Sequence, residues 1–184
     1  MKKEMKKSLR GKLLGLTLMS FMLVTVVVAV VGVTTIHNSM TKQVYREMRS
    51  IVSLVESRYD EAYPGAFGVQ LLDDGKYDIY KGEEVITKDY EIIDQIEDCF
   101  DYEVTLFCKN IRVQTTLRDS EGRRFLTTKA PTLVTAEVID GGKEAFYKDV
   151  TIGEEKHFAY YKPIVLDDGT IYGMIGVSCS AADV

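Results

Sequence analysis

The sequence predicts an α+β protein in which a long N-terminal helix, membrane-spanning in its first part, leads into an antiparallel sheet with flanking helices. Two observations carry this prediction. Residues 13–36 contain no charged side chain, and at about 1.5 Å per helical residue such a run covers the ~30 Å hydrocarbon core of a bilayer. After the helix, short strand-like runs are joined by hairpin-like turns, which favours antiparallel pairing.

Positive charge is concentrated in front of the apolar run. The first twelve residues hold six bases and one acid, whereas the rest of the chain holds 17 bases and 27 acids. Because basic flanks stay on the cytoplasmic side, we expect a cytoplasmic tail at 1–12 and an extracytoplasmic position for everything after residue 36. The competing interpretation is a cleaved signal peptide, but the run exceeds the roughly 7–15 residues of a signal core and no A-x-A-like site follows it. The acidic outer part argues against nucleic acid as a partner.

A long helix is predicted to continue over residues 37–63. Apolar residues recur at spacings of three and four from Tyr45 to Ala62, the period of an amphipathic helix. A second apolar flank of Val44, Ile51 and Leu54 widens this surface, so one stripe could pack on the domain's own sheet and the other on a partner helix of a homodimer. Pro64-Gly65 ends the helix.

The remaining elements are predicted from alternation and turn residues. Helices are expected at 89–100 and 131–140. The acidic pairs Asp73-Asp74 and Asp167-Asp168 fall in hairpin turns, where Asp favours the turn itself, so they are poor candidates for an acid–base pair. Strands are expected at 68–72, 77–80, 103–108, 111–118, 145–152, 156–165 and 170–179.

Motifs for catalysis or metal binding are missing from the sequence. It has no nucleophile elbow, H-E-x-x-H, Walker loop or G-x-G-x-x-G, and its two His and three Cys have no zinc-site spacing. We therefore expect no enzyme activity, no metal and no cofactor. Cys99 and Cys108 could pair in an oxidising space, but the favoured interpretation is that they and Cys179 are unpaired, small buried residues.

The candidate ligand contacts are polar and aromatic side chains on strands or next to a helix start. Alternation places Arg112, Gln114 and Thr116 on one side of their strand, from which an arginine could hold a carboxylate through two hydrogen bonds. Tyrosines offer aromatic walls with hydroxyl donors, and Tyr160 and Tyr161 point to opposite sides, so one of them can line the pocket. The predicted set is Arg112, Thr116, Thr128, Lys129, Tyr147, Tyr160 and Lys162.

Several short segments, taken in order and spacing, carry a family likeness. They are Tyr63-Pro64-Gly65, 77–82, 104–107, 111–116, 127–130, 157–163 and 172–176. Over about residues 38–180 they resemble the single Cache sensor domain of bacterial methyl-accepting chemotaxis proteins.

This resemblance implies a PAS-like antiparallel sheet behind the long helix, with a ligand pocket on the membrane-distal part of the sheet. It implies a sensor domain at 64–180, and residues 181–184 would begin the link to a second membrane helix. In related citrate and dicarboxylate sensor kinases, a strand arginine followed three positions later by histidine holds the carboxylate. Arg112 matches that arginine, whereas Thr115 stands at the histidine position, so citrate-like specificity is not implied.

The function expected from the resemblance is that of the sensing end of a transmembrane chemoreceptor in the cell membrane. A small extracellular ligand, favoured to carry a carboxylate, would shift the long helix and signal to a cytoplasmic module. The family's second membrane helix, HAMP linker and signalling coiled coil are not in the sequence to Val184, so we expect a fragment or a truncated protein. The alternatives are the sensor domain of a histidine kinase or cyclic-nucleotide enzyme, and a membrane-anchored structural or binding module.

Overall fold

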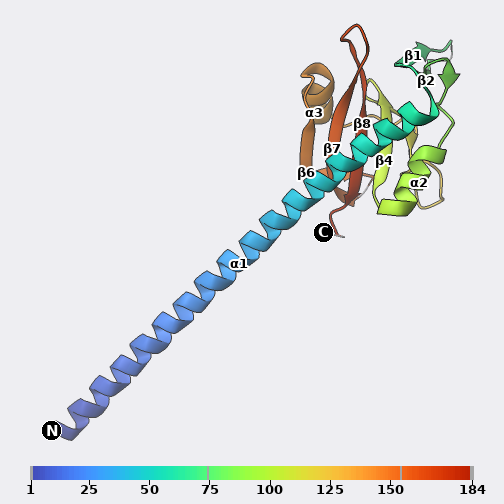
Figure 1. The fold of residues 1–184 in the computed structure, drawn as a ribbon. Coiled ribbons are helices and arrows are strands. Elements are labelled where there is room, and N and C mark those ends of the chain that lie inside the picture. Colours follow the sequence, from blue (N-terminus) through green and yellow to red (C-terminus); the bar gives the residue numbers. More distant parts are fainter. Residues whose placement is uncertain (1, 74, 154, 183–184) are drawn as a thin grey trace. The chain divides into compact units, whose positions relative to one another are not determined.

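The computed structural model describes residues 2–73, 75–153 and 155–182. Asp74 of the predicted hairpin turn and the last two residues of the predicted link lie outside this range. The first element is helix α1, Lys2–Ala62 (Figure 1). The chain divides into two compact units, the first ending at Lys42 and the second beginning at Gln43.

The first unit consists of the apolar part of α1. Within the described part of this helix, a stretch reaches a mean hydropathy of 2.6, and no residue of that stretch is buried by the rest of the chain. Exposing so much apolar surface to water would be costly. By length and composition, this stretch is able to cross a bilayer, in agreement with the prediction.

The part of α1 in the second unit packs against the domain with both of its apolar stripes. Met48, Val52, Val55 and Tyr59 are fully buried. Val44, Ile51 and Leu54 of the second flank join the same core. The prediction that this flank is free for a partner helix is wrong, because the domain covers both stripes. The face of α1 left exposed is polar and includes Gln43, Arg46, Glu47, Arg49, Ser50 and Ser53.

Two antiparallel sheets follow the helix. The smaller sheet has the order β1-β2-β3, and the larger one has the order β5-β4-β8-β7-β6. All predicted strands are present, although β5 ends earlier than expected, and β3 was missed because two residues beside the turn at Gly82 show no alternation. The strands are β1 Phe67–Leu71, β2 Tyr77–Lys81, β3 Glu84–Val85, β4 Glu103–Cys108, β5 Ile111–Thr115, β6 Ala145–Ile152, β7 Glu155–Val165 and β8 Ile171–Ser180.

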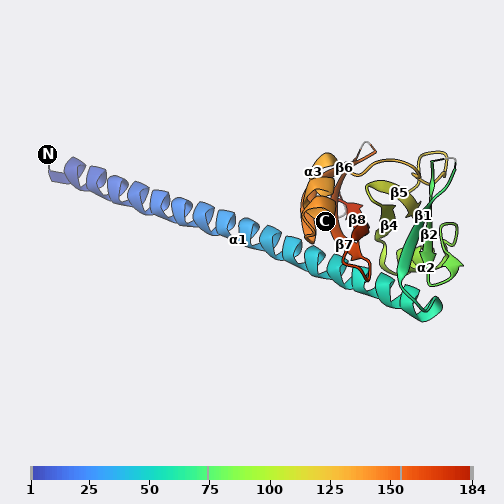
Figure 2. The same ribbon diagram turned by 90° about the horizontal axis from the view of Figure 1, so that it is seen from above.

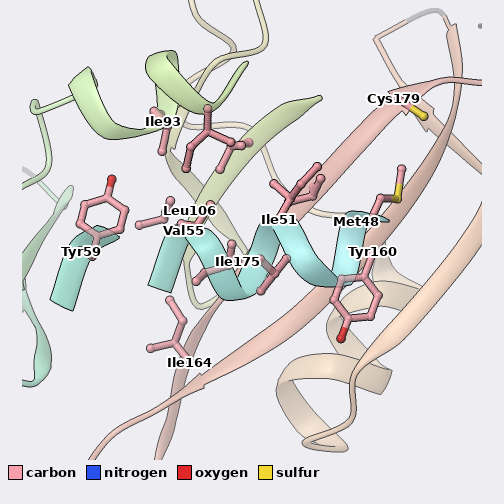
Figure 3. Packing of buried hydrophobic residues seen from close by; sticks show 14 of the residues in the cluster. Met48, Ile51, Val55, Tyr59, Ile93, Leu106, Tyr160, Ile164, Ile175 and Cys179 are labelled. Atoms are coloured by element: carbon pink, nitrogen blue, oxygen red, sulfur yellow. The ribbon is translucent and has the colours of Figure 1, made fainter. Parts of the chain in front are cut away.

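Helices cover both faces of the larger sheet. The second part of α1 and helix α2 (Glu91–Phe100) pack on one face (Figures 1 and 2). Figure 3 shows Leu106, Tyr160 and Ile175 in this first core beside residues of α1. The short helix α3 (Thr132–Val134) and the π-helical turn η1 (Thr135–Asp140) cover the other face. The strand neighbours Phe107, Tyr161 and Met174 form the second core there, as strand alternation requires.

Cys99, Cys108 and Cys179, all within the described residues, form no disulfide bond with one another. Cys108 and Cys179 are buried in strands, as expected. Cys99 is exposed instead, and it lies in the last turn of α2, where Asp98 and Phe100 are exposed as well. The prediction that Cys99 is buried is therefore wrong.

Close strand packing leaves no space for a side chain at Gly173 on β8. A Cβ atom at Gly173 would lie 1.9 Å from the carbonyl oxygen of Phe107, whereas a Cβ atom at Gly68 on β1 would meet its nearest neighbour at 3.8 Å. We expect Gly173→Ala to lower the free energy of unfolding by about 1–3 kcal/mol or more through overpacking, and Gly68→Ala to change it by no more than about 0.5 kcal/mol. Urea unfolding measures both, and equal effects would contradict this packing.

Candidate functional site

A β-bulge in β5 decides which way its polar side chains face. In the pairing of β4 with β5, Leu106 lies opposite Gln114 and Phe107 lies opposite Arg112, so Val113 is an extra residue. A bulge changes the alternation of the strand beyond it. Arg112 therefore faces the second core with Phe107, while Gln114 faces α1. The prediction that Arg112 and Gln114 share one side is wrong, because alternation in sequence cannot reveal an inserted residue.

Arg112 is a buried cation whose positive charge is only partly balanced by hydrogen bonds and other contacts. It is 6% exposed. Its Nη1 donates to Oγ1 of Thr128, and its Cζ lies 5.2 Å from the centre of the Phe107 ring. Its Nε is buried and has no hydrogen-bond partner, and no ion pair within the described part of the chain includes it. Burial lowers the pKa of the guanidinium, although an arginine still keeps its charge.

Arg112 also lines a cleft of about 550 Å³, a volume within the ~300–1,000 Å³ range of small-molecule pockets. Its walls come from the β1–β2 hairpin, the loop between β3 and α2, β5, and the segment 126–129. Tyr77, Tyr90 and Val113 supply apolar and aromatic surface. All ionisable lining groups among the described residues, apart from the tyrosines, are basic: Lys76, Lys88, Lys109, Arg112 and Lys129.

The structure brings together only part of the predicted set. Thr128 contacts Arg112 directly, and Lys129 lines the same cleft. Tyr147 lies on the second-core face, with its ring centre 6.1 Å from that of Tyr161, and it donates to Glu137 at 2.5 Å.

The other three predicted residues lie away from this cleft. The Oγ1 of Thr116 accepts a hydrogen bond from the Val104 amide at 3.0 Å, and Thr116 lines a different cavity. Tyr160 belongs to the α1 core, and Lys162 pairs with Glu56 of α1 at 2.6 Å. The side that Tyr160 and Lys162 face follows from strand phase, which the sequence of β7 does not fix.

Tyr161, which the predicted set did not include, lies on the same face of the sheet as Arg112. It is 3% exposed, and its ring centre lies 6.2 Å from that of Phe107 on the face of Arg112. Burial raises the pKa of its phenol to about 12, so Tyr161 remains a neutral hydroxyl near the guanidinium. The signal in the sequence was the Tyr160-Tyr161 pair, of which one member had to face each side.

A second cavity, of about 730 Å³, is lined by the partly buried carboxylate of Glu103. Oε2 of Glu103 has no hydrogen-bond partner, and Oε1 lies 3.8 Å from Nε2 of His157. Burial raises the pKa of Glu103 from 4.5 to about 7. Within the described residues, no group of three or more His, Cys, Asp or Glu side chains is placed to hold a metal ion.

The raised pKa of Glu103 makes stability depend on pH. Between pH 4.5 and about 7, the folded chain keeps a proton that the unfolded chain releases, so the free energy of unfolding should fall as pH rises through this window. Glu103→Gln should flatten this fall, and Glu83→Gln at an exposed turn position should not. Urea unfolding at a series of pH values measures the slopes, and an unchanged slope in Glu103→Gln would contradict the assignment.

Comparison with known proteins gives one family match. The family described as Single cache domain 3 matches residues 84–184. This range contains β3 to β8, α2, α3 and η1, but not α1, β1 or β2. No curated protein matches the chain. Single Cache domains are extracytoplasmic, ligand-binding sensor domains without catalytic activity. Since the match spans more than half of the chain and the fold agrees with it, this protein belongs to the single Cache domain family.

Proposed function

We propose that this chain is the sensing part of a transmembrane chemoreceptor, and that it binds a small extracytoplasmic ligand through a carboxylate held by Arg112. Lys129 adds a second positive charge to the same cleft, while Thr128 and Tyr161 lie beside Arg112. The bound ligand biases α1 between two states and so signals to a cytoplasmic module. A ligand can bias such an equilibrium only by its differential affinity for the two states, typically about 1–3 kcal/mol.

The observation that carries this proposal is the charge of the Arg112 cleft. A guanidinium that is 6% exposed loses hydration that an ion pair would normally replace. Here its Nε has no partner, and the described lining residues include lysines but no carboxylate. An anionic ligand supplies the missing charge, and the planar geometry of a carboxylate suits an arginine.

The membrane orientation in this proposal is inferred from the charges on either side of the apolar stretch. Because basic residues precede it and basic flanks stay on the cytoplasmic side, we infer a cytoplasmic N-terminus and an extracytoplasmic sensor unit. We further propose a homodimer. Because the apolar residues of α1 in the second unit are already buried by the domain, a helix–helix contact there would use the polar face around Arg46, Arg49 and Ser50.

Ligand binding is tested by thermal unfolding of the 184-residue chain in lipid nanodiscs against organic acids and amino acids, each paired with its neutral amide. Binding to the folded state alone raises its stability. A carboxylate ligand at about 100 times its Kd should raise the Tm by about 5 °C or more, and its amide should not. Arg112→Met should abolish the shift.

The control is Arg118→Met, which removes the same charge from an exposed arginine shortly after β5 and should keep the full shift. A shift that survives in Arg112→Met would overturn the placement of the ligand. The absence of any shift with the folded wild-type chain would favour the structural or binding module. The choice between a chemoreceptor, a histidine kinase and a cyclic-nucleotide enzyme rests on the attached output domain.

A further inference from the structure

Gln114 is a completely buried amide two residues after Arg112. Its Nε2 donates to the carbonyl oxygen of Asp89 at 2.7 Å and also to that of Ile86. These two residues bound the loop between β3 and α2, and Thr87 and Lys88 within this loop line the Arg112 cleft. Through these hydrogen bonds, Gln114 fixes the position of one wall of the cleft. Arg112, on the same strand, forms part of another wall.

The remaining hydrogen bond of Gln114 reaches α1. The hydroxyl of Tyr59 donates to Oε1 of Gln114 at 3.0 Å, and Tyr59 is fully buried. Burial raises the pKa of this phenol, so the hydroxyl stays protonated and remains a donor. Tyr63, one helical turn later, donates to the carboxylate of Asp89. The end of α1 is thus attached both to β5 and to the loop that lines the cleft.

The bulge couples these contacts mechanically. Arg112 and Gln114 flank the extra residue Val113 and face opposite sides of the sheet. Any backbone shift at Arg112 that accompanies anion binding also displaces the bulge, and Gln114 shares that backbone. Because Gln114 is fully buried and makes three hydrogen bonds, breaking any of them is costly, so the partners should follow its movement.

We propose that Gln114 is the positioning residue that transmits the state of the Arg112 cleft to α1, through its hydrogen bond with Tyr59. This inference rests on the proposed function, since it assigns the route by which that site acts. It makes the bulge of β5 the connection between the ligand side of the sheet and the helix side.

The test requires no ligand, because a substitution at Arg112 changes the charge of the cleft directly. Hydrogen exchange is measured by mass spectrometry on the 184-residue chain in nanodiscs, for the α1 peptide 52–62 and for a reference peptide 158–164 on β7. Peptide 158–164 reports any change in overall stability, and Arg112→Met should change exchange in peptide 52–62 by about threefold or more beyond the change in peptide 158–164. Arg118→Met, the charge-matched control, should change neither peptide.

The same comparison in a Tyr59→Phe background isolates the route. Tyr59→Phe removes the hydroxyl and keeps the ring, so the effect of Arg112→Met on peptide 52–62 should fall to less than about 1.5-fold. Gln114→Met, which breaks the same contact from the other side, provides a second background with the same expected loss. An effect of Arg112→Met that persists in both backgrounds, or that is missing in the otherwise wild-type chain, overturns the proposal.

Failure of this proposal is distinguishable from failure of the proposed function. If carboxylates shift the Tm through Arg112 while exchange in α1 does not depend on Tyr59, the site binds but signals by another route. If no carboxylate binds and the Tyr59-dependent effect is present, the transmission route stands and the assigned ligand class is wrong.

Discussion

The arrangement of this sensor domain depends on one buried positive charge and on the irregular strand that carries it. In a regular strand with no bulge at Val113, Arg112 and Gln114 would face the same side of β5. The bulge instead directs the guanidinium to the second core and the amide to α1. Burying a cation without an anion is unfavourable, and a protein retains such an arrangement where another requirement, such as ligand recognition, compensates for it.

The attachment of α1 to the domain combines an apolar core with specific polar contacts. Met48, Val52 and Val55 provide the area that holds the helix on the sheet, which is non-directional. The hydrogen bond of Tyr59 with Gln114 and the ion pair of Lys162 with Glu56 fix its register. Since α1 runs without interruption from Lys2 to Ala62, a displacement at Tyr59 enters the same helix that contains the apolar stretch.

Much of the fold could be predicted from the sequence, and the facing of the site residues could not. Periodicity located α1 and α2, and turn residues located nearly all strands, because these signals are local. Of the predicted ligand set, Arg112, Thr128 and Lys129 lie near one another in the structure. Tyr160 and Lys162 were placed with them although they face α1, and the second flank of α1 was left for a partner although the domain covers it. Both errors concern tertiary geometry, since strand phase, a bulge and the width of a sheet are set by pairing between distant segments.

The most direct test of the account is the free energy of unfolding of the ligand-free chain with and without the charge of Arg112. If the guanidinium is an uncompensated buried cation, Arg112→Met should be more stable than the wild type by about 1 kcal/mol or more, because the desolvation cost is removed while the buried stem is kept. If the contacts of Arg112 with Thr128 and Phe107 serve only to hold the fold, the substitution should instead lower the stability. The second result would contradict the central claim that this arginine is kept for an anion.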